Sequence, residues 1–307
     1  MDATGIRTKI TGHETFAVRY AWLPKAVRYV AETPALFQDE DSAMVTLGVG
    51  KNMVRAVRFW GECFGVIEQD QALRTSRVTP FGEALLGTDG HDPYLEHPAT
   101  LWLLHWQLAH ADPSLIGWDF LFNHWPYQEL KADRLVTEIK RYPAYDVGAI
   151  SDKTIESHIE VFIHTYAPGR EHKYLSREET LDSPLVDLGL VRRYSGDGRG
   201  NDTFAFTLEA RPELPIKLFC WAVSDYMERK GESDVVSFQE IAAGNSSPGR
   251  IFRLTEQSVR ERMAQIEKAS HGLLMSVETA STHLIKRRKK QSAADCLAEV
   301  FEGSYVG

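Results

Sequence analysis

The chain has 307 residues, of which 43% are hydrophobic and 25% are charged, and its formal net charge at pH 7 is −8. This composition is typical of a soluble globular protein with enough apolar residues for sizeable cores, and the length suggests about two domains. Its overall charge does not favour nucleic acid, so any contact with DNA must be local.

The N-terminal segment MDATGIRTKIT has no apolar core and is therefore not a signal peptide. No segment approaches the roughly 20 apolar residues that a membrane span needs. The three cysteines, Cys63, Cys220 and Cys296, are far apart and form no CxxC pair, which excludes a zinc ribbon and argues against a disulfide framework. The sequence thus predicts a cytoplasmic protein with no membrane partner.

Residues 1–90 are predicted to form an N-terminal winged-helix DNA-binding domain. Pro24 suits a first helical turn, and the helix should end near Ala31, before Pro34. In residues 45–87, the sequence LGVG predicts a turn before a helix that begins at Lys51. Residues 66–67 and 77–78 can pair as wing strands, and Thr79-Pro80 begins a short closing helix, FGEALLG.

The helix that begins at Lys51 has two different faces. Its polar arc consists of Lys51, Arg55, Arg58 and Glu62, spaced i, i+4, i+7 and i+11. Its apolar face consists of Met53, Val57, Trp60 and Phe64. A recognition helix places such cations against phosphates or base edges, and Asn52 is positioned to read adenine. We therefore predict DNA contact by Lys51, Asn52, Arg55 and Arg58. The alternatives are a solvated helix face and a winged helix that binds protein.

Residues 91–231 are predicted to form a helical middle region with a β-hairpin. A helix that begins at Pro98 is apolar almost all round and should be buried, with His105 as a hydrogen-bonded core residue. Further helices are expected over 129–141, 149–165 and 216–229, and a turn-rich segment, SGDGRGND, joins two β-like runs. The aromatic residues of WDFLFNHWPY (118–127) suit stacking on unpaired bases, but aromatic residues at this density are more often core.

Residues 232–307 are predicted to form a C-terminal basic helix-turn-helix-like unit. A short helix in VSFQEIAAG, a turn and a longer helix capped by Thr255 precede two possible wing strands, LLMSVET and THLIKRR. From residue 250 to 291 there are ten Lys or Arg against four Glu. We predict phosphate contacts by the basic run Lys286, Arg287, Arg288, Lys289 and Lys290, with a solvated surface as the alternative. The fold class is thus mainly α with a minor α+β component.

Phosphodiester cleavage commonly needs carboxylates that hold Mg²⁺ or Mn²⁺. Asp92 and Glu96, spaced i, i+4, are the candidate catalytic residues and metal ligands. In the alternative, Asp92-Pro93 starts a turn and Glu96 favours the dipole of the following helix. Glu14 is a third catalytic candidate, because His13 and Glu14 can form an acid–base pair. Its alternative is a structural turn in which Glu14 pairs with Arg19 or Arg28.

Four segments together resemble one bacterial family catalogued as a domain of unknown function: GHETFAVRYAWLPKA, VTLGVGKNMVRAVRFWGECFGVI, VTPFGEALLG and DPYLEHPATLWLLHW. The resemblance covers roughly residues 12–280. Members of this family are encoded beside a cysteine desulfurase and a sulfurtransferase that resembles PAPS reductases. Such operons replace a non-bridging phosphate oxygen of DNA with sulfur in anti-phage defence.

The family includes the B component of the single-strand phosphorothioation (Ssp) system, a DNA-nicking protein. The resemblance implies double-stranded DNA and the two sulfur-handling enzymes as partners, and nicking as an activity without assigned residues. We therefore expect a DNA-nicking endonuclease that uses a divalent metal in support of phosphorothioate modification. A non-catalytic DNA-binding scaffold or specificity subunit and a winged-helix transcriptional regulator remain as alternatives.

Overall fold

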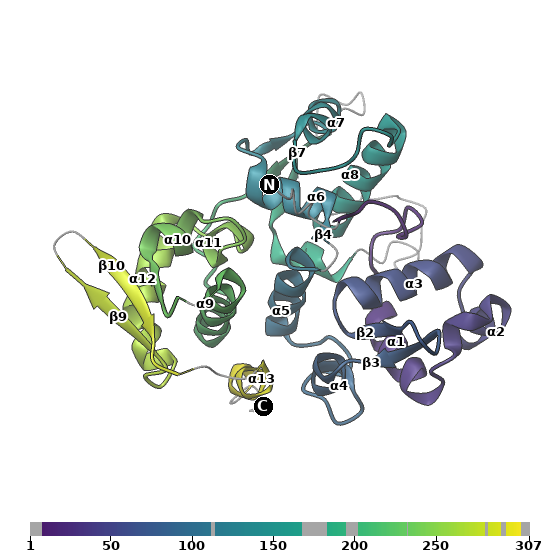
Figure 1. Ribbon diagram of the computed structural model, residues 1–307, viewed down its shortest axis with the longest axis horizontal. Helices are drawn as coiled ribbons and strands as arrows, with labels where there is room; N and C mark the ends of the chain where they lie inside the picture. Colours follow the sequence, from purple (N-terminus) through teal and green to yellow (C-terminus); the bar gives the residue numbers. More distant parts are fainter. Residues whose placement is uncertain are drawn as a thin grey trace. The chain divides into compact units, whose positions relative to one another are not determined.

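The computed structural model describes residues 8–111, 114–167, 183–194, 202–231, 233–279, 282–289 and 293–301. Its residues form two compact units, each built from two stretches of chain. Unit 1 takes residues 1–96 and 107–207, and unit 2 takes residues 97–106 and 208–307. Both units are mainly helical with small sheets (Figure 1), which confirms the expected fold class. The three-part division drawn from the sequence stays a prediction.

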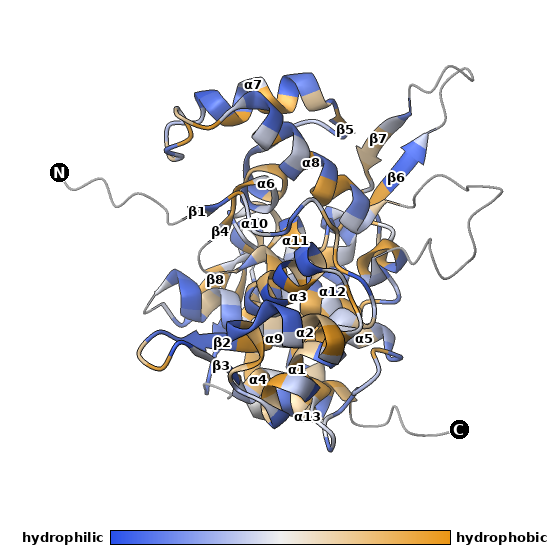
Figure 2. Cartoon of the chain, turned by 90° about the vertical axis from the view of Figure 1, so that its right-hand side faces the viewer, coloured by the Kyte–Doolittle hydropathy of each residue, from blue (hydrophilic) through white to orange (hydrophobic). Residues whose placement is uncertain are grey.

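The first half of unit 1 consists of three α-helices, a short 3₁₀ helix, a hairpin and a closing helix. In chain order these are α1 (Trp22–Glu32), the 3₁₀ helix η1 (Leu36–Gln38), α2 (Glu40–Leu47), α3 (Lys51–Cys63), β2 (Ile67–Asp70), β3 (Thr75–Val78) and α4 (Pro80–Leu86). Helices α1 and α2 both pack against α3 (Figure 1). The hairpin pairs Ile67 with Val78 and is mainly hydrophilic apart from its tip (Figure 2), where Leu73 is exposed.

The second half of unit 1 places helices against small sheets. Its elements are the end of α5 (Pro98–Ala109), β4 (Ser114–Leu115), α6 (Ile116–Asp119), the π-helix η2 (Phe120–His124), β5 (Glu129–Leu130), α7 (Ala132–Arg141), α8 (Asp152–Tyr166), the 3₁₀ helix η3 (Pro184–Leu188), β6 (Val191–Tyr194) and β7 (Thr203–Phe206). Strands β5, β7 and β6 form an antiparallel sheet, and β4 pairs in parallel with β1 (Thr8–Lys9).

A buried tryptophan pair joins the two halves of unit 1. Trp60 of α3 and Trp118 of α6 are buried, and their ring centroids are 5.8 Å apart. The indole Nε1 of Trp60 donates to the carbonyl oxygen of Phe16 at 3.0 Å, so the polar atom of this core residue is satisfied. The apolar face of α3 thus anchors the helix and leaves only its polar arc outside.

Unit 2 is a helical unit with one three-stranded sheet. Its elements are the start of α5, α9 (Ile216–Lys230), β8 (Val235–Ser237), α10 (Phe238–Ala243), α11 (Pro248–Ile251), α12 (Glu256–Ala269), β9 (Leu274–Glu278), β10 (His283–Arg287) and α13 (Ala293–Phe301). The strand order is β8-β10-β9, with both pairs antiparallel. His105 is buried and donates from Nε2 to the Ile251 carbonyl oxygen at 2.8 Å, which confirms the expected core histidine.

Side-chain caps explain where several helices begin. Asp39 accepts from the backbone N–H groups of Asp41 and Ser42 at the start of α2, and Thr79 accepts from Gly82 at the start of α4. Ser237 and Glu240 form a reciprocal capping box on α10. Thr255 caps α12 as expected from the sequence. Among the described residues, none of the helices combines the length and the hydrophobicity needed to cross a bilayer.

Candidate nucleic-acid interface

Helix α3 exposes a narrow polar stripe, which we call the α3 stripe: Lys51, Asn52, Arg55, Arg58 and Glu62. Lys51, Asn52 and Arg55 are exposed, and Arg58 and Glu62 are half-buried, while the rest of the helix apart from half-buried Met53 is buried. The side chains of Lys51, Arg55 and Arg58 retain 54%, 46% and 34% of their accessible surface. The structure therefore brings the predicted DNA-binding residues of this helix together on one surface. Their contact with DNA stays a prediction.

Carboxylates partly neutralise the α3 stripe. Both cations at its N-terminal end bind Glu40 of α2, with Lys51 Nζ at 2.8 Å from Oε2 and Arg55 Nε at 2.6 Å from Oε1. Hydrogen bonds from Arg55 and Lys51 lower the pKa of Glu40 to about 2. Glu40 was not among the residues predicted from the sequence. Glu40 lies in the acidic segment QDEDS (38–42), which is typical of the start of a helix. Such a segment does not indicate which other helix its charges will contact.

The other end of the stripe is paired in the same way. Arg58 Nε lies 2.9 Å from Glu62 Oε1 one turn further along α3, and Lys9 Nζ lies 3.6 Å from Glu62 Oε2. These pairs are partly exposed, and such pairs exchange partners at little cost. A phosphate can therefore replace Glu40 or Glu62 as the partner of these cations. The two carboxylates also repel anions, so an anion that does not fit closely against the cations is bound less well.

Glu14 lies in a tight turn beside the α3 stripe. Glu14 and Thr15 adopt left-handed backbone conformations with φ of 50° and 66°, and Phe16 N donates to His13 O at 2.9 Å to close the turn. Two consecutive non-glycine residues in this region are unusual and strained. Glu40 raises the pKa of Arg55, and the charge of Glu14 adds to this effect, so the Glu14 carboxylate interacts electrostatically with a cation of the α3 stripe. The pairings of Glu14 with Arg19 or Arg28 are not found, because Arg28 pairs with Glu32 and Arg19 lies over aromatic rings.

A buried histidine pair holds this turn in place. His13 Nε2 lies 3.0 Å from His158 Nδ1 of α8, and His158 Nε2 accepts from Gly117 N at 3.1 Å. Thr15 N donates to His13 Nδ1 at 3.1 Å, so each ring accepts a backbone N–H at its other nitrogen, and the direction of the hydrogen bond between the rings depends on their tautomers. The ring of His13 also hydrogen-bonds to the backbone of Ile10. Burial is the main cause that lowers the pKa of both rings, and both are thus neutral at pH 7.

Asp92 has a structural role in the loop before α5. Its carboxylate is buried, and Oδ1 accepts from the backbone N–H of Glu96 at 2.8 Å, as the turn alternative predicted. Glu96 is exposed. Among the described residues, no group of three or more His, Cys, Asp or Glu is arranged to hold a metal ion. Asp92 and Glu96 are thus neighbours, but no third metal ligand lies beside them among the described residues. Their catalytic and metal-binding roles stay predictions, and so does the catalytic role of Glu14.

The C-terminal basic run lies at the end of β10, where side chains alternate between the two faces of the strand. Lys286, Arg288 and Lys289 are exposed. Arg287 points inward: its side chain is 2% exposed, it pairs with Asp234 at 2.9 Å, and it donates to the Ser224 carbonyl oxygen at 3.3 Å. Arg287 therefore does not reach a phosphate in this structure, since it holds β10 in unit 2. Lys290 lies outside the described residues.

Helix α12 differs from α3 in its surface charge. Its exposed charged residues are Glu256, Arg260, Glu261, Glu267 and Lys268. Three acidic groups against two basic ones give this surface no cationic character. Arg260 is also placed over the Phe238 ring, 3.8 Å from its centroid. Any phosphate contact by unit 2 is therefore expected from the end of β10 rather than from α12.

Most of the aromatic residues in 118–127 form the core of unit 1. Trp118, Phe120, Phe122 and Trp125 are buried, whereas Tyr127 keeps 45% of its surface. The structure agrees with the core alternative for these four residues.

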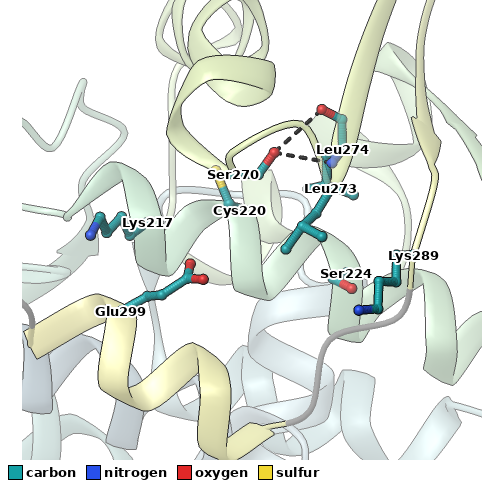
Figure 3. A pocket seen from close by; sticks show the side chains of 8 residues that line it. All are labelled: Lys217, Cys220, Ser224, Ser270, Leu273, Leu274, Lys289 and Glu299. Carbon is teal, nitrogen blue, oxygen red and sulfur yellow. Dashed lines mark hydrogen bonds between the residues drawn. The ribbon is translucent and has the colours of Figure 1, made fainter.

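A small cavity in unit 2 lies between α9, α13 and the start of β9 (Figure 3). Lys217, Cys220, Lys289 and Glu299 are among the residues that line it, and Ser270 Oγ accepts from Leu274 N at 3.0 Å on one side. Its volume of about 10 Å³ is that of one water molecule, which is too small for an organic ligand.

The chain matches the model of a family described as a protein of unknown function (DUF4007) over residues 10–301. It is similar to a crystal structure described as magnesium ion-bound SspB, with a TM-score of 0.80 and 29% identity over 97% of this chain and 89% of that chain. A second SspB crystal structure gives a TM-score of 0.81 and 28% identity over 98% of this chain and 89% of that chain. No curated protein matches the sequence.

These similarities confirm the resemblance to the family of the Ssp B component. The family model spans nearly the whole chain, from before the His13 turn to the end of α13. The chain belongs to the DUF4007 family.

Proposed function

We propose that this protein is the DNA-binding B component of a single-strand phosphorothioation system and that it nicks duplex DNA. The observation that carries the proposal is the likeness to SspB over 97% of the chain. The α3 stripe supports it, because three cations on one helix face suit contact with a DNA backbone. A cysteine desulfurase and a PAPS-reductase-like sulfurtransferase are the proposed protein partners.

In this proposal, α2, the turn at 48–50, α3 and the β2–β3 hairpin act as a winged helix. Helix α3 is the recognition helix, with Lys51 and Asn52 at its N-terminal end, the end that commonly contacts base edges. Helices α10 and α12 with β8, β9 and β10 act as a second winged helix. Lys286, Arg288 and Lys289 then extend the phosphate contacts.

The magnesium in one SspB structure makes a divalent cation the proposed cofactor. Magnesium in nucleic-acid enzymes is often held by one or two carboxylates together with phosphate oxygens. Asp92 and Glu96 would supply those carboxylates, with exposed Glu96 facing solvent and Asp92 fixed by its bond to Glu96 N. A bound ion would polarise the phosphodiester and activate a water molecule. Glu14 is a proposed proton acceptor near the α3 stripe.

Conversion of supercoiled plasmid to open circle tests the nicking activity. We expect conversion with Mg²⁺ or Mn²⁺ and none with EDTA. The variants Asp92→Asn, Glu96→Gln and Glu14→Gln remove one charge each. The amide that replaces the Asp92 carboxylate still offers an oxygen to Glu96 N, so the loop should remain folded. Glu32→Gln on α1 is the matched control. Intact plasmid with the wild-type protein in both metals contradicts nicking, and normal nicking by all three variants contradicts the residue assignment.

A non-catalytic scaffold is the second candidate, because the buried hydrogen bond of Asp92 gives that residue a structural role that needs no metal. A scaffold predicts co-purification with the sulfurtransferase, DNA binding that depends on Lys51 and Arg55, and no plasmid conversion.

A further inference from the structure

A second candidate binding site, lined by polar and aromatic side chains, lies in unit 1 on elements other than α3. It is an open cleft of about 260 Å³ between the π-helix η2, the loop after it and α7. Its principal lining residues are Phe120, His124, Trp125, Tyr127, Arg134 and Tyr142. The volume lies just below the range of roughly 300–1,000 Å³ of small-molecule sites. The cleft therefore has room for a single ring system.

The aromatic walls of this cleft are fixed before any ligand arrives. Trp125 is buried and its Nε1 donates to the Glu129 carbonyl oxygen at 3.1 Å. Tyr142 lies against His124, with ring centroids 4.4 Å apart and an angle of 30° between the rings, and its hydroxyl is 3.0 Å from His124 Nδ1. Burial and the charge of Asp119 raise the pKa of Tyr142, so its phenol is neutral at pH 7. Rigid neutral rings suit stacking on another flat ring, because little side-chain entropy is lost.

Two arginines stand at the rim of the cleft. The Arg134 guanidinium lies 3.8 Å from the centroid of the Tyr127 ring and 5.5 Å from that of Trp125. A stacked guanidinium keeps its N–H edge available for a phosphate. Arg141 is 73% exposed, and its pairing with Glu138 is long, at 3.8 Å. Two cations against one carboxylate give the rim a positive balance.

We propose that this cleft binds one unpaired nucleobase of a DNA strand, with Arg134 and Arg141 on the adjoining phosphates. Flat rings beside a cationic rim match the two chemical parts of a nucleotide, and base–aromatic stacking tolerates any sequence. The inference rests on the proposed action on DNA and adds a single-stranded ligand to it. A nick or an opened duplex supplies such a strand.

Binding of a fluorescein-labelled 12-nucleotide single strand, measured by anisotropy in EDTA, tests the proposal without any need for cleavage. We expect Tyr142→Ala and Arg134→Ala each to weaken single-strand binding roughly tenfold, because the first removes a stacking ring and the second removes a phosphate contact. Tyr142→Phe, which keeps the ring, should bind nearly as the wild type does. Tyr94→Ala and Arg28→Ala change an exposed tyrosine and an exposed arginine elsewhere in unit 1 and are the matched controls.

Duplex binding separates this proposal from the proposed function. The cleft variants should bind a 20-base-pair duplex within about twofold of the wild type, whereas Lys51→Ala/Arg55→Ala should bind the duplex more weakly. If the proposed function is wrong, Lys51→Ala/Arg55→Ala should bind the duplex as the wild type does, while Tyr142→Ala and Arg134→Ala should still bind the single strand more weakly. Equal single-strand affinity of wild type and both cleft variants overturns the cleft proposal.

Photocrosslinking gives a readout that does not depend on the folding of variants. A strand with one 5-iododeoxyuridine should crosslink to Tyr127 or Tyr142, as identified by peptide mass spectrometry. A tenfold excess of unlabelled strand should abolish the crosslink, and the same excess of free deoxynucleoside monophosphate should not. Crosslinks only outside residues 120–143, or equal competition by the free nucleotide, would overturn the assignment to a DNA strand.

Discussion

His13 and His158 are 145 positions apart in the sequence, yet their ring nitrogens lie 3.0 Å apart in the interior of unit 1. Through this contact α8 holds the turn that presents Glu14 to the α3 stripe. The rings are also stacked, with centroids 5.2 Å apart. A proton added to either ring would place a charge in a buried apolar site beside a second imidazole. The pair therefore makes unit 1 sensitive to acid.

Unit 1 should lose stability as the pH falls below about 6.5. In the unfolded chain both rings titrate near pH 6.5. In the folded protein burial, together with His13, lowers the pKa of His158 to about 3, and burial also lowers the pKa of His13. The unfolded chain thus takes up protons first, and His158 alone costs up to about 1.4 kcal/mol of stability for each pH unit between its unfolded and folded pKa values. Hydrogen exchange of the α8 amides between pH 7.5 and 5.5 measures this loss.

His158→Gln should make the stability of α8 less dependent on pH, at the cost of a lower stability at pH 7.5. The matched control is His164→Gln, an exposed position on the same helix. An unchanged pH dependence in His158→Gln, or an equal change in His164→Gln, contradicts the role of the buried pair.

Gly12→Ala should destabilise the turn that carries Glu14. Gly12 has a φ of 113°, and a Cβ there would lie 2.5 Å from Cδ2 of Phe59, which is itself buried. Strain and overpacking together should cost roughly 1–3 kcal/mol. Gly148→Ala is the control, because its φ lies outside the left-handed region and nothing is within 4 Å of its added Cβ. Thermal unfolding gives the comparison, and equal melting temperatures for the two variants would falsify this account.

Glu40→Gln should strengthen binding to duplex DNA, because it frees Lys51 and Arg55 from their present partner. We expect affinity to rise roughly threefold to tenfold at low salt and to depend more steeply on salt. In Lys51→Ala/Arg55→Ala the salt slope should instead fall by about 2. Anisotropy titrations at several salt concentrations measure both, with Glu32→Gln as the control. Unchanged affinity in Glu40→Gln means that the α3 stripe does not meet phosphate.

Adjacent residues of β10 should respond in opposite ways. Lys286→Ala should weaken duplex binding without changing the melting temperature, since Lys286 is exposed. Arg287→Ala leaves Asp234 and the Ser224 carbonyl without their donor and should lower the stability of unit 2, by roughly 2 kcal/mol once the partial exposure of Asp234 is allowed for. The same loss of stability in both variants would contradict the inward orientation of Arg287.

Local patterns predicted much of the secondary structure. The helix expected from Lys51 is α3, the strand pairs at 66–78 and 273–288 appear as β2–β3 and β9–β10, and the helices near 24–31, 149–165 and 216–229 are α1, α8 and α9 with small shifts of their ends. Such elements carry their signals in periodicity and caps. The expected helix at 129–141 begins later, at Ala132, because residues 129–130 pair with β7.

Elements set by distant partners were not predictable in this way. Helix α2 was not predicted because its eight residues carry little helical periodicity, and β8 is a strand only because β10 lies beside it. The same limit holds for the site. The cations of α3 follow from spacing alone, but the pairing of Lys51 and Arg55 with Glu40, the inward side chain of Arg287 and the contact of His13 with His158 depend on tertiary packing.

Unit 2 includes ten residues, His97–Trp106, that are preceded and followed in the sequence by segments of unit 1. Trp102 and Trp106 of this insert both contact the ring of Phe252, at centroid distances of 5.8 and 5.3 Å. Proteolysis at a single bond cannot release unit 2 whole, and a fragment that begins at Leu208 lacks two tryptophans of its own core. The C-terminal basic surface is thus inseparable from a segment synthesised more than a hundred residues earlier, and neither unit consists of a single continuous stretch of the chain.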